Sequence, residues 1–304
     1  MTGGAWPRSA RIDAPRLVER IAEITGVRLV LEGPCPGGEV GAAYVRWPDG
    51  RRSVLNEGHT RTGPLLDLAR AAGVPTARQE LSAHIDGVRV IVQQRLPGTP
   101  PTTIDASLVR QMVDLNDRLA GLLAVPQDGA HAGHPHQRHQ RAAGHQRAAS
   151  RRAAQPAELY LTDDGPGFCL HRPLAAHSRR TARLLAWVHE VGSADTPADG
   201  DDLVHLDYQP GNVLVQDGRI TGLIDWDGAG RGDRHLDLVV LRFYLLHQAP
   251  ALTGIVDERL TGVDPARVRA YWAHISLRQV DWSIRHHDAA TVDRWLDIAE
   301  SGMS

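Results

Sequence analysis

The first hundred residues contain one amphipathic segment followed by short apolar runs. Hydrophobic positions recur near helical spacing across residues 11–24, which predicts a helix. Runs with strand character then follow, interrupted by a short predicted helix over residues 65–72. The predicted strands are residues 27–32, 42–47, 52–56, 81–84 and 88–93. An Asp-Gly pair between the last two is typical of a tight hairpin turn, so the pattern predicts a small antiparallel sheet.

After residue 105 the pattern becomes mainly helical. Helical spacing predicts helices over residues 105–123, 178–190, 235–247, 265–286 and 289–299. Strand character returns in residues 159–170 and in a short hairpin over residues 213–224. Three prolines and a glycine between residues 97 and 101 are typical of a linker. The sequence therefore predicts an α+β fold with a small sheet-rich lobe, residues 1–97, and a larger helical lobe, residues 98–304.

Residues 129–157 differ from the rest of the chain. They contain five histidines, five arginines, no acidic residue and almost no large apolar residue. Such a segment has too little apolar surface to form a core, so we expect a mobile insertion in the larger lobe. The histidines leave a metal-binding tract open as a second interpretation, although their spacing matches no defined site.

Composition narrows the classes of function. A chain of 304 residues with a net charge of −2 can bury sizeable cores and lacks the basic surface that nucleic-acid binding needs. No apolar run reaches membrane-spanning length, and no signal peptide is recognisable. The cysteines, Cys35 and Cys169, lie far apart, which favours a reduced, cytoplasmic protein. Because the tract at 129–157 contributes five positive charges, the remainder carries −7, which suits a cationic ligand.

The strongest chemical pattern lies in residues 205–227. Residues 205–212 read His-Leu-Asp-Tyr-Gln-Pro-Gly-Asn, and residues 224–227 read Ile-Asp-Trp-Asp. Protein kinases use an Asp, an Asn five residues later and a second Asp further along as base and magnesium ligands. The corresponding positions here are Asp207, Asn212 and Asp225.

A hairpin is expected to bring these groups together. The Asp-Gly pair at residues 217–218 predicts a two-residue turn, and the resulting register places Asn212 opposite Leu223, close to Asp225. Carboxylate and amide oxygens suit Mg²⁺, which takes its other ligands from phosphates and water. Asp207 precedes the hairpin and can reach an acceptor hydroxyl near the same metal.

These residues resemble those of the aminoglycoside phosphotransferase family, bacterial small-molecule kinases related in fold to protein kinases. Family members read His-Gly-Asp-x-x-x-x-Asn, then Ile-Asp-Trp, then Gly-Asp-x-x-x-Asp-Leu, and residues 232–238 match the last element. The likeness is sharp over residues 203–245 and diffuse over residues 27–125. It implies a two-lobed protein-kinase-like fold.

The resemblance also implies roles for individual residues. Asp207 is the expected catalytic base, and Asn212 and Asp225 are the expected Mg²⁺ ligands. His205 and Asp237 are expected to support the catalytic loop.

The small lobe is expected to bind the nucleotide, either ATP or GTP. A glycine-rich loop between two strands is the kinase arrangement that covers the phosphates, and Gly37, Gly38 and Gly41 are the candidates. By resemblance the chain leaves the sheet through the hinge, where Gln93 and Arg95 are candidates for contact with the purine ring of the nucleotide.

Two features depart from the family pattern. Leu206 replaces a glycine in the catalytic loop, and all 34 basic residues are arginine, so the phosphate-binding lysine is absent. Asn56 occupies its expected position, and the following helix offers no glutamate as a partner. Positive charge must then come from magnesium, backbone N–H groups or an arginine, and the candidates are Arg46, Arg52 and Arg61.

The sequence thus predicts a kinase that phosphorylates a hydroxyl of a small cationic antibiotic, an aminoglycoside or a basic peptide antibiotic, and so gives resistance. A metabolite kinase acting on an amino alcohol or a sugar remains a second interpretation. A nucleotide-binding pseudokinase is a third, because the lysine is missing.

Overall fold

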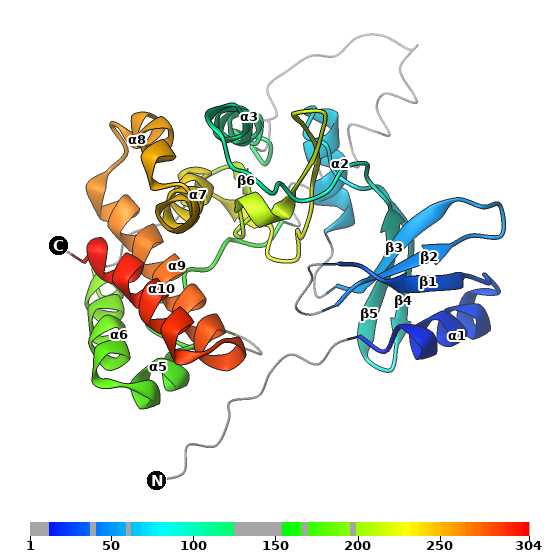
Figure 1. Ribbon diagram of the computed structural model, residues 1–304, viewed down its shortest axis with the longest axis horizontal. Coiled ribbons are helices and arrows are strands. Elements are labelled where there is room, and N and C mark those ends of the chain that lie inside the picture. The colour runs from blue at the N-terminus through cyan, green and yellow to red at the C-terminus, as the bar shows by residue number, and fades with distance from the viewer. Residues whose placement is uncertain are drawn as a thin grey trace, which may run out of the picture.

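The computed structural model of the chain describes residues 12–36, 41–58, 62–124, 154–165, 170–194 and 199–303. A sheet carrying one helix lies at one end of the molecule, and a larger group of helices lies at the other (Figure 1). This is the two-lobed α+β fold that the sequence predicted. Gly37, Gly38, Arg61 and Cys169 fall outside the described residues, and so does the predicted insertion up to residue 153.

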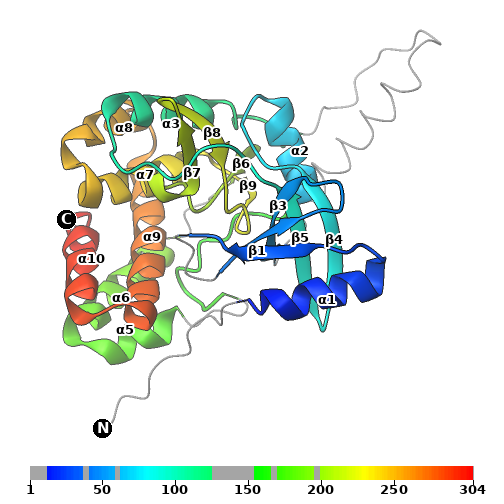
Figure 2. The ribbon, with the colours of Figure 1, turned by 45° about the vertical axis from the view of Figure 1, so that its right-hand side comes forward.

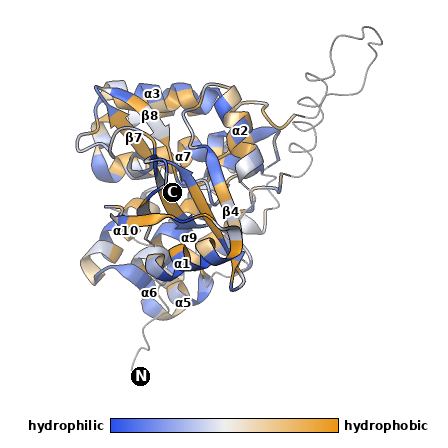
Figure 3. Cartoon of the chain, turned by 90° about the vertical axis from the view of Figure 1, so that its right-hand side faces the viewer, coloured by the Kyte–Doolittle hydropathy of each residue, from blue (hydrophilic) through white to orange (hydrophobic). Residues whose placement is uncertain are grey.

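The small lobe is built on a five-stranded antiparallel sheet with the strand order β1-β2-β3-β5-β4. The strands are β1 (Val30–Pro34), β2 (Ala43–Arg46), β3 (Arg52–Glu57), β4 (Gln79–Ile85) and β5 (Val88–Gln94). The helix α1 (Ala14–Thr25) lies along one face of this sheet (Figure 2). Hydrophobic and hydrophilic residues alternate along α1 (Figure 3), and its Leu17 and Ile21 are buried against Leu55 and Val90.

The helix α2 (Gly63–Ala71) follows β3 in the sequence but packs against the large lobe. Its Leu65, Leu66 and Leu68 share a buried cluster with side chains of α3 (Ala106–Asp117) and β8 (Arg219–Leu223). The backbone N–H of Leu223 donates to the carbonyl of Pro75 over 2.7 Å, which extends this contact. The chain between β3 and β4 therefore forms part of the interface between the lobes.

The large lobe is mainly helical. Its remaining helices are α5 (His171–His177), α6 (Arg179–Gly192), α7 (His235–Gln248), α8 (Thr253–Leu260), α9 (Pro265–His286) and α10 (Ala289–Ser301), with short 3₁₀ turns η1 (Pro210–Asn212) and η2 (Pro250–Leu252). Two small sheets lie between α6 and α7 in the sequence. The strand β6 (Asp202–Val204) pairs with β9 (Gly230–Gly232), and β7 (Val213–Gln216) pairs with β8.

An aromatic cluster lies in the core of the helical lobe. Phe243 of α7 stacks on Trp295 of α10 with ring centroids 5.6 Å apart and meets the edge of Trp272 of α9 at 5.1 Å. All three side chains are buried. The cluster fixes α7 against its neighbours, and the first turn of α7 carries Asp237.

The predicted elements over residues 159–170 and 105–123 differ most from the structure. Residues 159–165 form no strand and α5 begins at His171, so the strand predicted over residues 159–170 is wrong for the described residues. Asp164 instead accepts a hydrogen bond from the backbone N–H of His171 over 2.9 Å, which suits the start of a helix. The helix predicted over residues 105–123 ends at Asp117 and continues as turns.

The last residues of the predicted insertion lie against the large lobe. The backbone N–H of Ala157 donates to the carbonyl of Arg231 over 2.7 Å, next to a bridge between Pro156 and Arg231. Across the described ranges of the chain, no helix has the length and apolarity needed to cross a membrane.

Phe243→Ala should lower the free energy of unfolding by about 3–5 kcal/mol, because it leaves a gap in a packed aromatic cluster. Equilibrium unfolding in urea measures the change. Ile24→Ala is the control, because its side chain is 50% exposed and its loss should stay within about 0.5 kcal/mol. A loss below about 1 kcal/mol for Phe243→Ala would contradict the packing described.

Candidate active site

The loop between β6 and η1 carries the predicted base Asp207 and has an uncommon backbone conformation at the residue before it. Leu206 has a φ of 69°, in the left-handed region that side chains other than glycine rarely adopt. The carboxylate of Asp237 accepts hydrogen bonds from the backbone N–H groups of His205 at 2.8 Å and Leu206 at 2.9 Å. Burial raises the pKa of Asp237 to about 7, although these two N–H groups act in the opposite direction. The structure thus places Asp237 against the catalytic loop.

His205 connects this loop with the segment that carries Asp225. Its Nε2 lies 2.9 Å from the carbonyl oxygen of Ile224, and its Nδ1 accepts the backbone N–H of Asp207 at 3.3 Å. Burial lowers the pKa of His205 to about 4, against the charge of Asp207, which raises it. The ring is therefore neutral, with its Nε2–H donating to Ile224.

Two amide side chains hold the carboxylate of Asp207. Asn212 Nδ2 donates to the Asp207 carboxylate at 2.6 Å and to its backbone carbonyl at 2.9 Å. Gln209, which the sequence analysis did not single out, donates to the two carboxylate oxygens at 3.0 and 3.2 Å. These neutral partners fix the position of Asp207 without cancelling its charge.

The hairpin brings Asn212 and Asp225 together, although its register differs from the prediction. The turn at residues 217–218 forms as expected, with both φ values positive. An irregularity between Leu214 and Val215 shifts the pairing by one residue. The carbonyl of Asn212 consequently accepts the backbone N–H of Ile224 at 2.9 Å, so Asn212 lies one residue closer to Asp225 than predicted.

Asp225 lines the pocket between the lobes, and its side chain is exposed there. Burial, followed by the negative charges of Asp207 and Asp227, raises the pKa of Asp225 to about 7. Within the described residues no group of three or more His, Cys, Asp or Glu side chains is arranged to hold a metal ion. A cation beside Asp225 would favour the ionised form of this carboxyl group.

The oxygens at this point suit magnesium. Asn212 uses its Nδ2 for Asp207, which leaves its Oδ1 available. No described residue donates a hydrogen bond to that Oδ1 or to the carboxylate of Asp225. Mg²⁺ prefers such oxygen ligands and completes its octahedral shell with water and phosphate.

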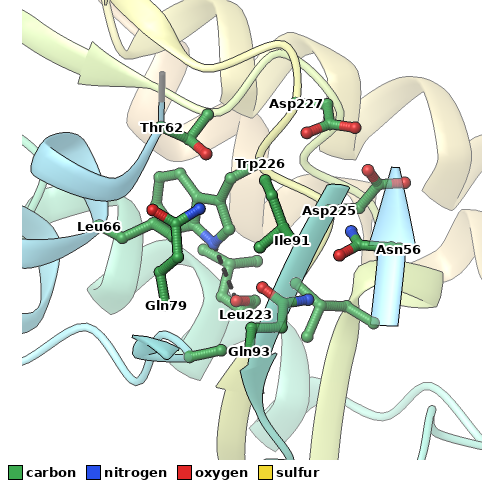
Figure 4. Close-up of a pocket in the computed structure, with 12 residues that line it drawn as sticks. Asn56, Thr62, Leu66, Gln79, Ile91, Gln93, Leu223, Asp225, Trp226 and Asp227 are labelled. Atoms are coloured by element: carbon green, nitrogen blue, oxygen red, sulfur yellow. Dashed lines mark hydrogen bonds between the residues drawn. The ribbon is translucent and has the colours of Figure 1, made fainter. Parts of the chain in front are cut away.

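A pocket between the lobes faces Asp225 (Figure 4). It is lined by Asn56 of β3, Thr62 before α2, Gln93 of β5 and the segment of residues 223–227. Asn56 occupies the position expected for a lysine, and its Oδ1 is buried without a hydrogen-bond partner among the described residues. The small lobe therefore offers neutral amide groups to the pocket, opposite the carboxylates of Asp225 and Asp227.

The predicted nucleotide-binding residues are spread along the sheet. Gln93 lines the pocket together with Asn56. Arg95 follows β5 and is exposed, with its guanidinium carbon 4.3 Å from the centre of the Tyr44 ring. Gly41 precedes β2 and has a φ of 92°, which favours glycine.

Two of the arginines expected to replace the lysine are engaged elsewhere. Arg46 and Arg52 face each other across β2 and β3, which places Arg52 about 13 Å along the strand from Asn56. Both bind Glu32, with Nε–Oε distances of 3.1 and 3.0 Å. The expectation that Arg46 or Arg52 reaches the phosphates is therefore corrected, and Arg61 lies outside the described residues.

The sequence analysis missed a cation beside the catalytic loop. Arg278 lies in α9, and its Nη1 donates to the carbonyl of Leu206 at 2.9 Å. Burial raises the pKa of Asp225, and the charge of Arg278 partly opposes this rise. Burial lowers the pKa of His205, and the charge of Arg278 adds to this fall. Arg278 is separated from Leu206 by 72 residues with no fixed spacing, so only the packing of α9 reveals the contact.

Comparisons with known proteins agree with this geometry. A family model described as the phosphotransferase enzyme family, APH, matches residues 49–271, which is more than half of the chain. Among curated proteins, no sequence matches.

The fold is similar to that of solved antibiotic kinases. One is a thermostable mutant of aminoglycoside phosphotransferase APH(4)-Ia in a ternary complex with AMP-PNP and hygromycin B, with a TM-score of 0.62 and 18% identity over 94% of this chain and 97% of that chain. Another is spectinomycin phosphotransferase APH(9)-Ia with ADP and spectinomycin, with a TM-score of 0.59 and 12% identity over 95% of this chain and 98% of that chain. At these identities the likeness shows the fold.

Arg46→Ala and Arg52→Ala should each leave nucleotide affinity within about twofold of the wild type, because both side chains are paired with Glu32 far from the pocket. Calorimetric titration with ATP and Mg²⁺ measures the affinity. A tenfold loss of nucleotide affinity in either variant would show that the arginine does contact the phosphates.

Proposed function

We propose that this chain, which belongs to the phosphotransferase enzyme family, transfers the γ-phosphate of a nucleoside triphosphate to a hydroxyl of a small cationic antibiotic. Family membership makes it a phosphotransferase with a hydroxyl group as acceptor. The observation that carries the proposal is the convergence of Asp207, Asn212 and Asp225 beside the pocket between the lobes.

Asp207 is the proposed base. Its carboxylate is oriented by Asn212 and Gln209 and is only partly buried, so an acceptor hydroxyl can approach it. It would orient this hydroxyl and accept its proton as the oxygen attacks the γ-phosphorus. His205 and Asp237 serve as supports that fix the loop, because phosphoryl transfer depends mainly on positioning and electrostatics.

Asn212 and Asp225 would hold Mg²⁺, with ATP or GTP as the phosphate donor. When bound, the metal neutralises charge on the phosphates. Backbone groups near Gln93 and Arg95 would contact the purine ring of the nucleotide. The glycine-rich loop, which includes Gly41, would cover the phosphates. The AMP-PNP and ADP bound in the similar structures support a nucleotide at this cleft.

The proposed acceptor is an aminoglycoside or a basic peptide antibiotic, whose phosphorylation would give resistance. Two similar structures hold hygromycin B and spectinomycin, respectively. Outside the tract at residues 129–157 the chain carries a surplus of acidic groups, since that tract contributes five positive charges to a total of −2. Such a surplus attracts a cationic acceptor.

The pocket supports one other candidate, a pseudokinase that binds a nucleotide without turnover. Asn56 leaves the phosphates without the usual ammonium group, and neither Arg46 nor Arg52 replaces it. A panel of hydroxylated cationic antibiotics, assayed with labelled ATP and GTP, separates the two. Transfer to any acceptor supports the kinase, whereas binding without transfer or hydrolysis supports the pseudokinase.

Asp207→Asn should lower turnover by about two orders of magnitude or more, the size typical of a general base, with nearly unchanged nucleotide affinity. Steady-state transfer assays and calorimetry measure the two quantities. Asp217→Asn is the matched control, because Asp217 lies in an exposed turn with a φ of 51° that asparagine also adopts. Near-normal turnover in Asp207→Asn would remove Asp207 from the role of base.

Asp225→Ala should abolish the dependence of nucleotide binding on Mg²⁺, and Asn212→Ala should weaken it, because both supply oxygens to the same point. Calorimetry with Mg²⁺ and with EDTA gives the comparison, with Asp217→Asn again as the control. If the wild type binds ATP equally well under both conditions, the metal site is wrongly assigned.

A further inference from the structure

The catalytic loop contains a backbone conformation that its own side chain opposes. Leu206 has a φ of 69°, where a Cβ crowds the neighbouring carbonyl and only glycine is free of the conflict. Glycine is also the residue that the resembling family uses at this position. Asp207 is the next residue, so any relaxation of φ at Leu206 would move the proposed base.

Charged side chains hold both backbone polar groups of Leu206. Its N–H donates to Asp237 of α7 at 2.9 Å, and its carbonyl accepts from Arg278 of α9 at 2.9 Å. The Leu206 side chain is buried over Gly228, where an added Cβ would lie 3.2 Å from the Cβ of Leu206. The left-handed residue is therefore held from two helices, and its side chain lies so close to residue 228 that a Cβ there would make a tight contact.

Arg278 differs from the other arginines on α9. Arg267, Arg269 and Arg285 each pair with an acidic side chain. Within the described part of the chain, Arg278 forms no ion pair, and its hydrogen bond goes to the Leu206 carbonyl. A guanidinium is planar and rigid, so a bond from it also constrains the direction of the carbonyl it contacts.

We propose that Arg278 is a positioning residue for phosphoryl transfer, which holds the Leu206 carbonyl and so keeps the left-handed loop in the conformation that presents Asp207. The proposal rests on the proposed function for its effect on turnover. The conformation of the loop can be measured without turnover. A purely structural arginine would change stability but would not show a dependence on the residue at position 206.

The first test measures the loop itself by hydrogen exchange in a double-mutant cycle. Arg278→Met should speed exchange of the backbone amides at residues 205–207 by roughly tenfold, because the hydrogen bond from Arg278 to the Leu206 carbonyl is lost. In a Leu206→Gly background the same change should alter the exchange rate by less than about threefold, since glycine adopts this φ without the hydrogen bond from Arg278.

The second test measures hydrolysis of ATP with Mg²⁺, in which water replaces the acceptor, and transfer to hygromycin B. Arg278→Met should lower kcat by about tenfold to a hundredfold, the size expected for a misplaced base, while nucleotide affinity stays within about twofold. Leu206→Gly should again shrink this loss. Arg278→Lys should recover only part of it, because an ammonium lacks the planar fork.

Arg269→Met is the control, because Arg269 lies on the same helix, pairs with Glu190 and is away from the loop. It should leave exchange at residues 205–207 and turnover unchanged.

The proposal is overturned if Arg278→Met changes neither quantity, if its effect is equal in both backgrounds, or if the loss appears in nucleotide affinity alone. If Arg278→Met does not fold, Arg278→Lys carries the same comparison. A wild type that neither hydrolyses ATP nor phosphorylates any antibiotic of the panel refutes the proposed function, and the exchange cycle still decides the role of Arg278.

Discussion

The buried carboxylate of Asp237 is the group on which the site depends. Its oxygens accept two consecutive backbone N–H groups of the catalytic loop at 2.8 and 2.9 Å. A buried carboxylate is costly unless it is hydrogen-bonded, so the loop and the start of α7 must be assembled together. The helix α7 is in turn fixed by the packing of Phe243 against Trp295. The helical core therefore sets the position of Asp207, even though no residue of that aromatic cluster belongs to the site.

Local patterns in the sequence were sufficient for much of the fold and for the placement of the main carboxylates. The helices α7, α9 and α10 were predicted because they carry long apolar patterns. The turn at residues 217–218 brought Asn212 and Asp225 together because an Asp-Gly pair accepts the positive φ values that a tight hairpin needs. The one-residue error in register came from the irregularity between Leu214 and Val215. No residue of the turn indicates this irregularity in the sequence.

What the sequence could not predict depends on contacts between distant segments. Residues 159–165 have apolar residues of strand character but no strand beside them, so they stay irregular. Arg46 and Arg52 were plausible phosphate ligands until the register of β2 and β3 placed them at the far end of the strands, beside Glu32. Arg278 reaches the catalytic loop only because α9 packs beneath it. In each case tertiary packing, rather than local spacing, decided the outcome.

The placement of α2 determines what each half of the chain could do alone. By sequence, α2 precedes the linker near residue 97, yet Leu65, Leu66 and Leu68 are buried with α3 and β8. A fragment cut at that linker would carry these leucines into water as an apolar patch, and the helical half would lose part of its covering. The two lobes are therefore not interchangeable modules. Recombination of this chain with a related one would have to exchange α2 together with the helical half, rather than with the sheet that surrounds it in the sequence.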